Sequence, residues 1–344
     1  MSGPAPKATT TTPGGEALPP WLRPELERLL ALQEAGRLHH ALLLTGRSGL
    51  GKRLLAEALA RGLLCRQDPG ERPCGHCRSC RLTAGQSHPD LRRLGPEVEG
   101  ERGEILVDSA RGLVEFLHLS PQLGGPRVAV IVPCDRLNRA AANSLLKSLE
   151  EPPPGAFLIL ATGRPGRLPS TVRSRCAVRS LTPPDADTAE RWLGERTEAG
   201  SERVRRALAL AGGMPLAAER LLAQGSLAGY EALLQQLQRL AAGGDPVKEA
   251  EGWEQAPVEL ADGVAAILAD LLRQRHGAPD RGLLPAGLAR QLAAGGSAER
   301  LHQAFLRISE HRRGLEQPLN GRLAAEAIFL ELAAALSGAH PSRQ

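Results

Sequence analysis

Ala41-Leu-Leu-Leu-Thr-Gly-Arg-Ser-Gly-Leu-Gly-Lys-Arg53 is the stretch of this chain that decides the fold. Its apolar first part predicts a buried strand, and the residues after it predict a helix whose apolar face is formed by Leu54, Leu55, Ala58 and Leu59. The turn between them matches the phosphate-binding loop G-x4-G-K-[S/T] through Gly46, Gly49, Gly51 and Lys52. A strand, this loop and a helix in succession indicate an α/β P-loop domain.

The last position of this loop carries the wrong residue for ATP hydrolysis. A working loop places a Ser or Thr hydroxyl on Mg²⁺, whereas Arg53 is a cation without an acceptor atom. A second magnesium position is also lost, because Val132-Pro133 follows an apolar strand where such ATPases carry an acid, and the nearest acid is Asp135. Two separate losses predict a frame without hydrolysis. Nucleotide binding stays open, because Lys52 and the helix N-terminus still attract phosphate.

Four of the six cysteines are clustered in sixteen residues, at Cys65, Cys74, Cys77 and Cys80. Two overlapping C-x2-C spacings and four thiolates predict a structural zinc site without an open coordination position. An iron–sulfur cluster is one alternative, although the closing C-x3-C-P of the bacterial ferredoxin run is absent. Unligated thiols are the other. Cysteines used for metal favour a reducing cytoplasm, and Cys134 and Cys176, outside the cluster, are expected to be small buried hydrophobes.

Apolar strands alternate with helical patterns over the first half of the chain. Strands are expected near 91–94, 127–132, 157–161 and 176–181, and helices near 26–36, from Asp108 as N-cap, and over 140–149. Such alternation predicts a doubly wound parallel sheet. From Pro183 onward only helical patterns remain, near 187–195, 202–211, 216–223 and in several blocks after 226.

Gly and Pro clusters and the loss of strand signal predict four parts in the chain. They are a disordered leader at 1–20, an α/β domain at 21–182 with a zinc module at 65–80, a helical lid at 183–225, and a helical C-terminal domain at 226–344.

Composition excludes several classes of protein. Charged residues make up 24% of the 344 and hydrophobic residues 42%, which is ordinary for a globular protein. The sequence contains no apolar run of membrane-spanning length. Aromatic residues are only 2%, which argues against a dedicated single-strand binder, since such proteins stack bases on aromatic rings. The net charge of +5 permits contact with nucleic acid without requiring it.

Several stretches together resemble the clamp-loader branch of the AAA+ proteins. They are 36–46, 74–80, 87–90, 140–153 and 169–176, and the C-terminal block matches more loosely through 320–326. The resemblance implies an AAA+ domain, a lid and an oligomerising collar. It also implies a place in a hetero-pentameric ring, with gamma/tau- and delta-type subunits, that opens the sliding clamp of bacterial DNA polymerase III and loads it on primed DNA.

The resemblance also assigns residue roles. In Ser174-Arg175-Cys176, Arg175 matches the arginine finger that this family offers to ATP in a neighbouring subunit, and Thr162 matches the first sensor position. The lid sensor arginine is missing at 213–216. This pattern is typical of a non-hydrolysing subunit within a polymerase holoenzyme, with neither ATPase nor polymerase activity of its own. The alternatives are a gamma/tau-like motor, or a small-molecule kinase with a zinc lid, which leaves the helical C-terminal block unexplained.

Overall fold

The computed structural model describes residues 18–95, 103–224, 226–278, 283–314 and 320–336. The chain divides into two compact units, Met1–Pro184 and Asp185–Gln344. The predicted leader at 1–20 lies mostly outside the described residues. Its predicted end is wrong, because Leu18 and Pro19 are already buried against the first unit.

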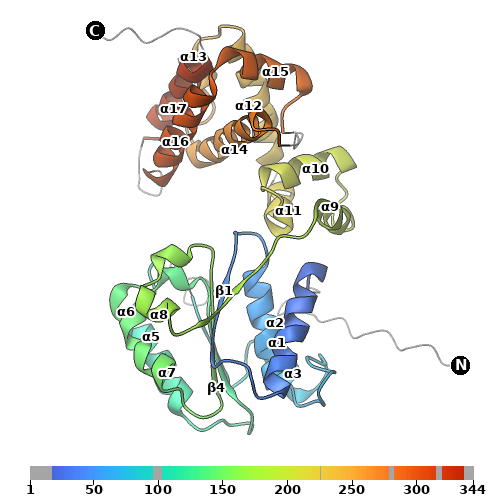
Figure 1. The fold of residues 1–344 in the computed structure, drawn as a ribbon, viewed down its shortest axis with the longest axis vertical. Coiled ribbons are helices and arrows are strands. Elements are labelled where there is room, and N and C mark those ends of the chain that lie inside the picture. Colours follow the sequence, from blue (N-terminus) through green and yellow to red (C-terminus); the bar gives the residue numbers. More distant parts are fainter. Residues whose placement is uncertain (1–17, 96–102, 225, 279–282, 315–319, 337–344) are drawn as a thin grey trace, which may run out of the picture. The chain divides into compact units, whose positions relative to one another are not determined.

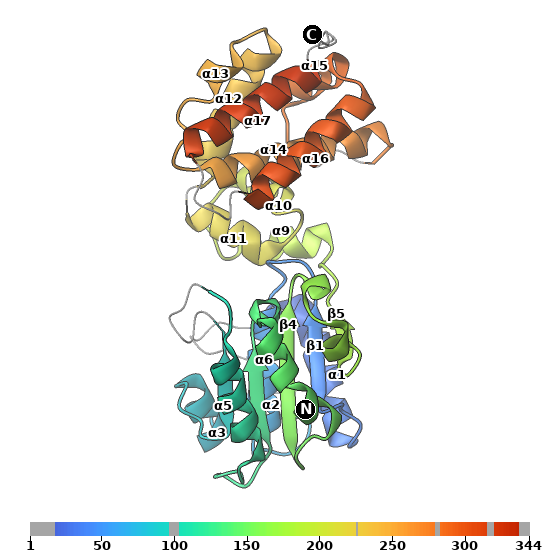
Figure 2. The same cartoon turned by 90° about the vertical axis from the view of Figure 1, so that its left-hand side faces the viewer.

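A parallel sheet of five strands forms the centre of the described part of the first unit. The strands are β1 (Ala41–Thr45), β2 (Leu91–Leu94), β3 (Arg127–Ile131), β4 (Ala156–Thr162) and β5 (Ala177–Ser180), in the order β2-β3-β4-β1-β5. Figure 2 shows β1 between β4 and β5. Every residue of β1 and β3 is buried, as expected for strands covered on both faces. The predicted doubly wound sheet is confirmed, and each predicted strand agrees to within one residue at either end.

Helices cover both faces of this sheet (Figure 1). One face carries the 3-10 turn η1 (Pro20–Leu22), α1 (Arg23–Glu34), α2 (Lys52–Leu64) and α3 (Arg78–Ala84). The other carries α5 (Val107–His118), α6 (Arg139–Ser144), α7 (Leu146–Glu150) and α8 (Ser170–Arg173). The short turns η2 (Cys134–Arg136) and η3 (Pro165–Arg167) follow β3 and β4. The phosphate loop and Val132-Pro133 therefore follow the carboxyl ends of β1 and β3.

Three local predictions in this unit are wrong. Asp108 does not cap α5, which begins at Val107, and its carboxylate instead meets Arg111 at 3.5 Å. The helix expected over 140–149 splits at Leu145. The Ser144 hydroxyl donates to the Ala141 carbonyl, which in an unbroken helix would accept the Leu145 N–H. The cysteine segment is not wholly a loop, since α3 begins directly after Cys77 and carries Cys80.

Helices are the regular elements of the described part of the second unit. α9 (Ala186–Gly194), α10 (Ser201–Leu210) and α11 (Pro215–Ala223) surround one small core. A larger core joins α12 (Ser226–Ala241), α13 (Pro246–Glu249), α14 (Pro257–Arg275), α15 (Ala286–Gly295), α16 (Ala298–Gly314) and α17 (Gly321–Leu336). The predicted helical C-terminal half is confirmed, whereas the division into lid and collar at residue 225 stays a prediction.

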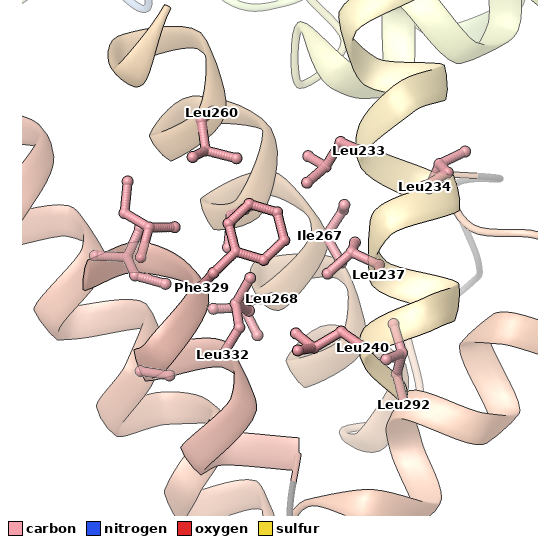
Figure 3. Packing of buried hydrophobic residues seen from close by; sticks show 14 of the residues in the cluster. Leu233, Leu234, Leu237, Leu240, Leu260, Ile267, Leu268, Leu292, Phe329 and Leu332 are labelled. Atoms are coloured by element: carbon pink, nitrogen blue, oxygen red, sulfur yellow. The ribbon is translucent and has the colours of Figure 1, made fainter. Parts of the chain in front are cut away.

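Leucine fills the larger core because aromatic residues are scarce. Figure 3 shows Phe329 of α17 among leucines and an isoleucine from α12 and α14, including Leu233, Leu260 and Ile267. Phe329 is fully buried. None of the helices in the described ranges is long and apolar enough to cross a membrane.

Candidate functional site

The glycines of the phosphate loop shape the turn between β1 and α2. Gly46, Gly49 and Gly51 have φ angles of 140°, 85° and 94°, which residues other than glycine adopt only with strain. Gly51 is also the N-cap residue of α2. The predicted strand, loop and helix are thus in place around residues 41–64.

Lys52 is folded back onto its own loop. Its Nζ donates hydrogen bonds to the carbonyl of Gly46 at 2.7 Å and to that of Arg47 at 2.8 Å. Gly163, directly after β4, closes the other side, since a Cβ there would lie 3.7 Å from Nζ. Burial lowers the pKa of the Lys52 ammonium, and the Asp135 carboxylate partly offsets this. The lysine that would meet a phosphate therefore bonds to loop carbonyls.

Asp135 and Thr162 satisfy one another beside this lysine. The Thr162 hydroxyl donates to Oδ1 of Asp135 and accepts the backbone N–H of Arg164 at 2.8 Å. Thr162 is 1% exposed. Asp135 lies in η2, beyond the end of β3. It is the acid nearest to the position where ATPases carry a magnesium ligand, and here its carboxylate accepts from the Thr162 hydroxyl. The structure thus brings Lys52, Thr162 and Asp135 together.

A small cleft adjoins the loop. The Trp21 indole donates to the Leu50 carbonyl at 2.9 Å, and a Cβ on Gly46 would meet the Leu181 carbonyl at 3.1 Å. The cleft encloses about 250 Å³, below the roughly 300–1,000 Å³ usual for ligand pockets. Its walls are Trp21, Leu22, Pro24, Glu25, Arg28, Ser180, Leu181 and Thr182.

The four clustered cysteines converge on one point. Their Sγ atoms all lie within 4.8 Å of one another, and the Cys65–Cys77 and Cys74–Cys80 sulfur pairs are both 3.9 Å apart. Four sulfurs in a tetrahedron around zinc, each about 2.3 Å from it, are about 3.8 Å apart. The sulfur atoms therefore fit one tetrahedral ion. Cys65, Cys74, Cys77 and Cys80 are the residues that would hold it.

Backbone N–H groups favour the thiolate form of Cys77, whereas burial raises the pKa of the Cys65 and Cys80 thiols. Cys77 N–H points to the Cys74 sulfur, and Cys80 N–H to the Cys77 sulfur, each at 3.4 Å. Burial raises the pKa of the Cys77 thiol, but the backbone N–H groups of Arg66 and Cys80 outweigh it and lower the pKa to about 6. A metal ligand must be deprotonated, so these donors support metal binding.

The two cysteines outside the cluster behave differently. Cys134 is fully buried, and burial raises the pKa of its thiol well above the usual value. Cys176 is half-buried, donates to the Val172 carbonyl at 3.2 Å, and has a pKa raised by burial to about 11. Both thiols are therefore protonated at neutral pH, and the predicted burial is confirmed for Cys134 but wrong for Cys176.

A hydrogen-bonded chain anchors the cysteine cluster to the sheet. The Ser79 hydroxyl on α3 meets His88 Nε2 at 2.9 Å, and His88 Nδ1 accepts the Asp90 N–H at 3.0 Å. The Asp90 carboxylate accepts the N–H groups of Gln122 and Leu123 at 2.7 and 2.8 Å. Sequence reasoning used residues 87–90 only as a resemblance, and their role in holding α3 against β2 was missed.

Arg175 lies at the surface of the first unit, just beyond α8. Its Nε and Nη2 contact Oε1 of Glu150 at 2.6 and 2.5 Å, and its Nη1 donates to the Thr171 carbonyl at 2.9 Å. The side chains of Arg175 and Glu150 are 35% and 51% exposed. Glu150 thus orients the guanidinium predicted to act as a finger, a role that the sequence alone did not reveal.

Comparison with known proteins identifies the family. A family model described as DNA polymerase III, delta subunit, matches residues 23–185. The chain is 41% identical over 261 residues to the DNA polymerase III subunit delta' of Escherichia coli K12, covering 75% of this chain and 77% of that one. The chain belongs to the delta-prime family of DNA polymerase III subunits.

Other relatives agree with this membership. The delta' subunit of Pseudomonas aeruginosa is 39% identical and covers 70% of this chain and 73% of its own length. The tau subunit of Salmonella typhimurium is 37% identical over 141 residues, which is 41% of this chain and 21% of that protein. The first unit of this delta-prime family member is an α/β domain with a parallel sheet and a four-cysteine cluster, and a helical region follows it.

Proposed function

We propose that this delta-prime family member is a non-hydrolysing subunit of the cytoplasmic clamp loader of DNA polymerase III. It would join gamma/tau and delta subunits in a hetero-pentameric ring that opens the sliding clamp and loads it on primed DNA. Family membership supports this role. Arg53 and Val132-Pro133, in place of the groups that bind Mg²⁺, carry the non-hydrolysing part of the proposal, and the folded-back Lys52 agrees with it.

Hydrolysis requires a lysine on the phosphates and a liganded Mg²⁺. Lys52 instead bonds to Gly46 and Arg47, and Asp135 is engaged by Thr162. The purified chain with ATP and Mg²⁺ should therefore show no more turnover than its Lys52→Ala variant. Clear turnover that disappears in this variant would instead identify a gamma/tau-like motor.

Arg175 supplies, in this proposal, an arginine finger to the neighbouring subunit. A guanidinium offered in trans stabilises charge on the transferring phosphoryl group, and such fingers accelerate hydrolysis by about 10³-fold or more. Its surface position and its orientation by Glu150 support the assignment. Because Glu150 is itself half exposed, a phosphate from the neighbour can replace its carboxylate without uncovering a buried charge.

The reconstituted ring tests this assignment. Arg175→Ala should lower hydrolysis at the adjacent site by about 10³-fold while leaving assembly intact in gel filtration. Arg173→Ala is the matched control, because Arg173 lies on the same short helix and its Nη1 donates to the Pro165 carbonyl of its own unit. Equal rates for wild type and Arg175→Ala would remove the finger assignment.

The four-cysteine cluster holds, in this proposal, a structural zinc ion. Four thiolates fill the coordination sphere and leave no position for substrate, so the ion stabilises the module rather than catalysing. Metal analysis of the purified chain should find about one zinc per chain. Iron, or a chain purified without metal, would contradict it.

A further inference from the structure

Arg61 is a buried cation whose donors are not all used. It lies in the last part of α2 and is 2% exposed. Its Nε and Nη2 atoms have no hydrogen-bond partner within the described ranges. Leaving a buried guanidinium without partners is costly, so a charged arginine persists there only where a compensating group is present.

The obvious acid is already engaged. Glu57, one helical turn before Arg61, accepts from Arg93 through Nε at 2.8 and 3.0 Å and through Nη2 at 2.8 Å. The Glu57 side chain is buried, at 8% exposure, and that of Arg93 is mostly covered, at 11%. A bidentate arginine–carboxylate pair uses the carboxylate fully. The positive charge of Arg61 therefore remains without an equal partner among the described residues.

Two of the clustered cysteines lie on or next to the helices around Arg61. Cys65 follows α2 four residues after Arg61, and residues four apart lie on one helix face. α3 contacts α2 and carries Cys80, which is 1% exposed. Cys80 lies one turn before Thr83, and the Thr83 carbonyl accepts a hydrogen bond from Arg93 at 3.4 Å. Burial lowers the pKa of the Arg61 guanidinium, while the Cys80 thiolate, ahead of Glu57, raises it.

We propose that Nε and Nη2 of Arg61, which have no partner among the described residues, donate hydrogen bonds to thiolate sulfurs, Cys80 foremost, once a metal ion holds these sulfurs deprotonated, and so keep the metal centre against α2. A divalent ion with four thiolates carries a net charge of about −2. A buried guanidinium is the complementary charge, and donors outside the ligand shell fix ligand geometry. Arg61 is thus a positioning residue, and the inference rests on the metal centre proposed above.

The test compares metal retention in full-length variants. Arg61→Met removes the donors and the charge with little change of volume, and Arg61→Lys keeps the charge without the fork. Arg179→Met is the matched control, because Arg179 lies on β5, at the opposite edge of the sheet from β2, and its Nε is also buried without a partner among the described residues. Zinc loss to a chromogenic chelator and the charge-transfer spectrum of the Co²⁺-loaded protein are the readouts.

We expect Arg61→Met to hold zinc about 10- to 100-fold more weakly and to shift the Co²⁺–thiolate bands. Arg61→Lys should be intermediate, and Arg179→Met should match wild type in metal affinity even if it unfolds more easily. Wild-type zinc affinity and spectrum in Arg61→Met would overturn the inference. If Arg61→Met does not fold, wild-type affinity in Arg61→Lys overturns it instead. A wild-type chain without bound metal would refute the zinc proposal itself, which is a distinguishable result.

Discussion

The two ends of α2 carry cations in opposite situations. At the N-terminal end, Lys52 gives its hydrogen bonds to the carbonyls of its own loop. Near the C-terminal end, Arg61 keeps two buried nitrogens without partners among the described residues, beside four converging sulfurs. The first end has acceptors for its cation within the protein, whereas in our proposal the metal centre balances the charge of the second.

Under the proposed function, this difference separates a degenerate phosphate loop from a working metal site. A loop whose lysine is satisfied internally loses little when nucleotide is absent, because its buried charge already has hydrogen-bond acceptors. A cluster of thiolates and a buried guanidinium need the ion for their charges to balance. Sequence motifs alone predict a ligand site at both ends of α2. The hydrogen bonds of Lys52 and the unpartnered nitrogens of Arg61 distinguish the two ends.

The largest expected effect comes from removing a metal ligand. Cys80→Ser should abolish zinc retention and lower the free energy of unfolding by more than about 4 kcal/mol, because a structural ion contributes folding energy directly. Metal analysis and urea unfolding measure both effects. Cys176→Ser, outside the cluster, should keep the metal. Equal zinc content in Cys80→Ser and wild type would contradict the claim that the cysteine cluster at the C-terminal end of α2 holds the metal.

The middle of α2 should show the next largest effect. Glu57→Gln leaves Arg93 buried without its carboxylate, close to the buried cation of Arg61, and should cost about 3–5 kcal/mol. Glu27→Gln, at an exposed position of α1, is the control and should stay within about 0.5 kcal/mol. Chemical denaturation compares the two variants. A Glu57→Gln variant as stable as the control would show that the Glu57–Arg93 ion pair does not stabilise the fold.

The N-terminal end should show the smallest effect. Lys52→Met removes two hydrogen bonds at a half-buried position, so we expect a loss of about 1 kcal/mol. Urea unfolding measures this loss, and the variant should retain its zinc, since Lys52 lies a full helix length from Cys65. A loss as large as that of Glu57→Gln would mean that the loop is a structural centre after all.

The sequence predicts the frame of this molecule well and its side-chain networks poorly. Alternating apolar strands and glycine positions locate all five strands of the described sheet, because burial on both faces leaves a clear pattern. Helix boundaries are less certain, as the break at Leu145 depends on a single hydroxyl of Ser144. The spacing of Cys74, Cys77 and Cys80 locates the cysteine cluster, because residues this close in sequence must also be close in space.

Contacts between distant segments leave no local signal. Glu57 and Arg93 are 36 residues apart, and Arg175 meets Glu150 across 25 residues. Nothing in the pattern around Arg61 distinguishes it from an exposed helical arginine until its burial is known. The same holds for Lys52, since a motif specifies the residue and not the direction of its side chain.

Thermal unfolding of the intact chain tests the contrast between the two ends most directly, with one sample given saturating ATP and Mg²⁺ and another a zinc-selective chelator. The account predicts a midpoint that changes by less than about 1 °C with ATP, since weak binding stabilises little, and falls by more than about 10 °C with chelator. A midpoint raised by several degrees with ATP and unchanged by the chelator would contradict it.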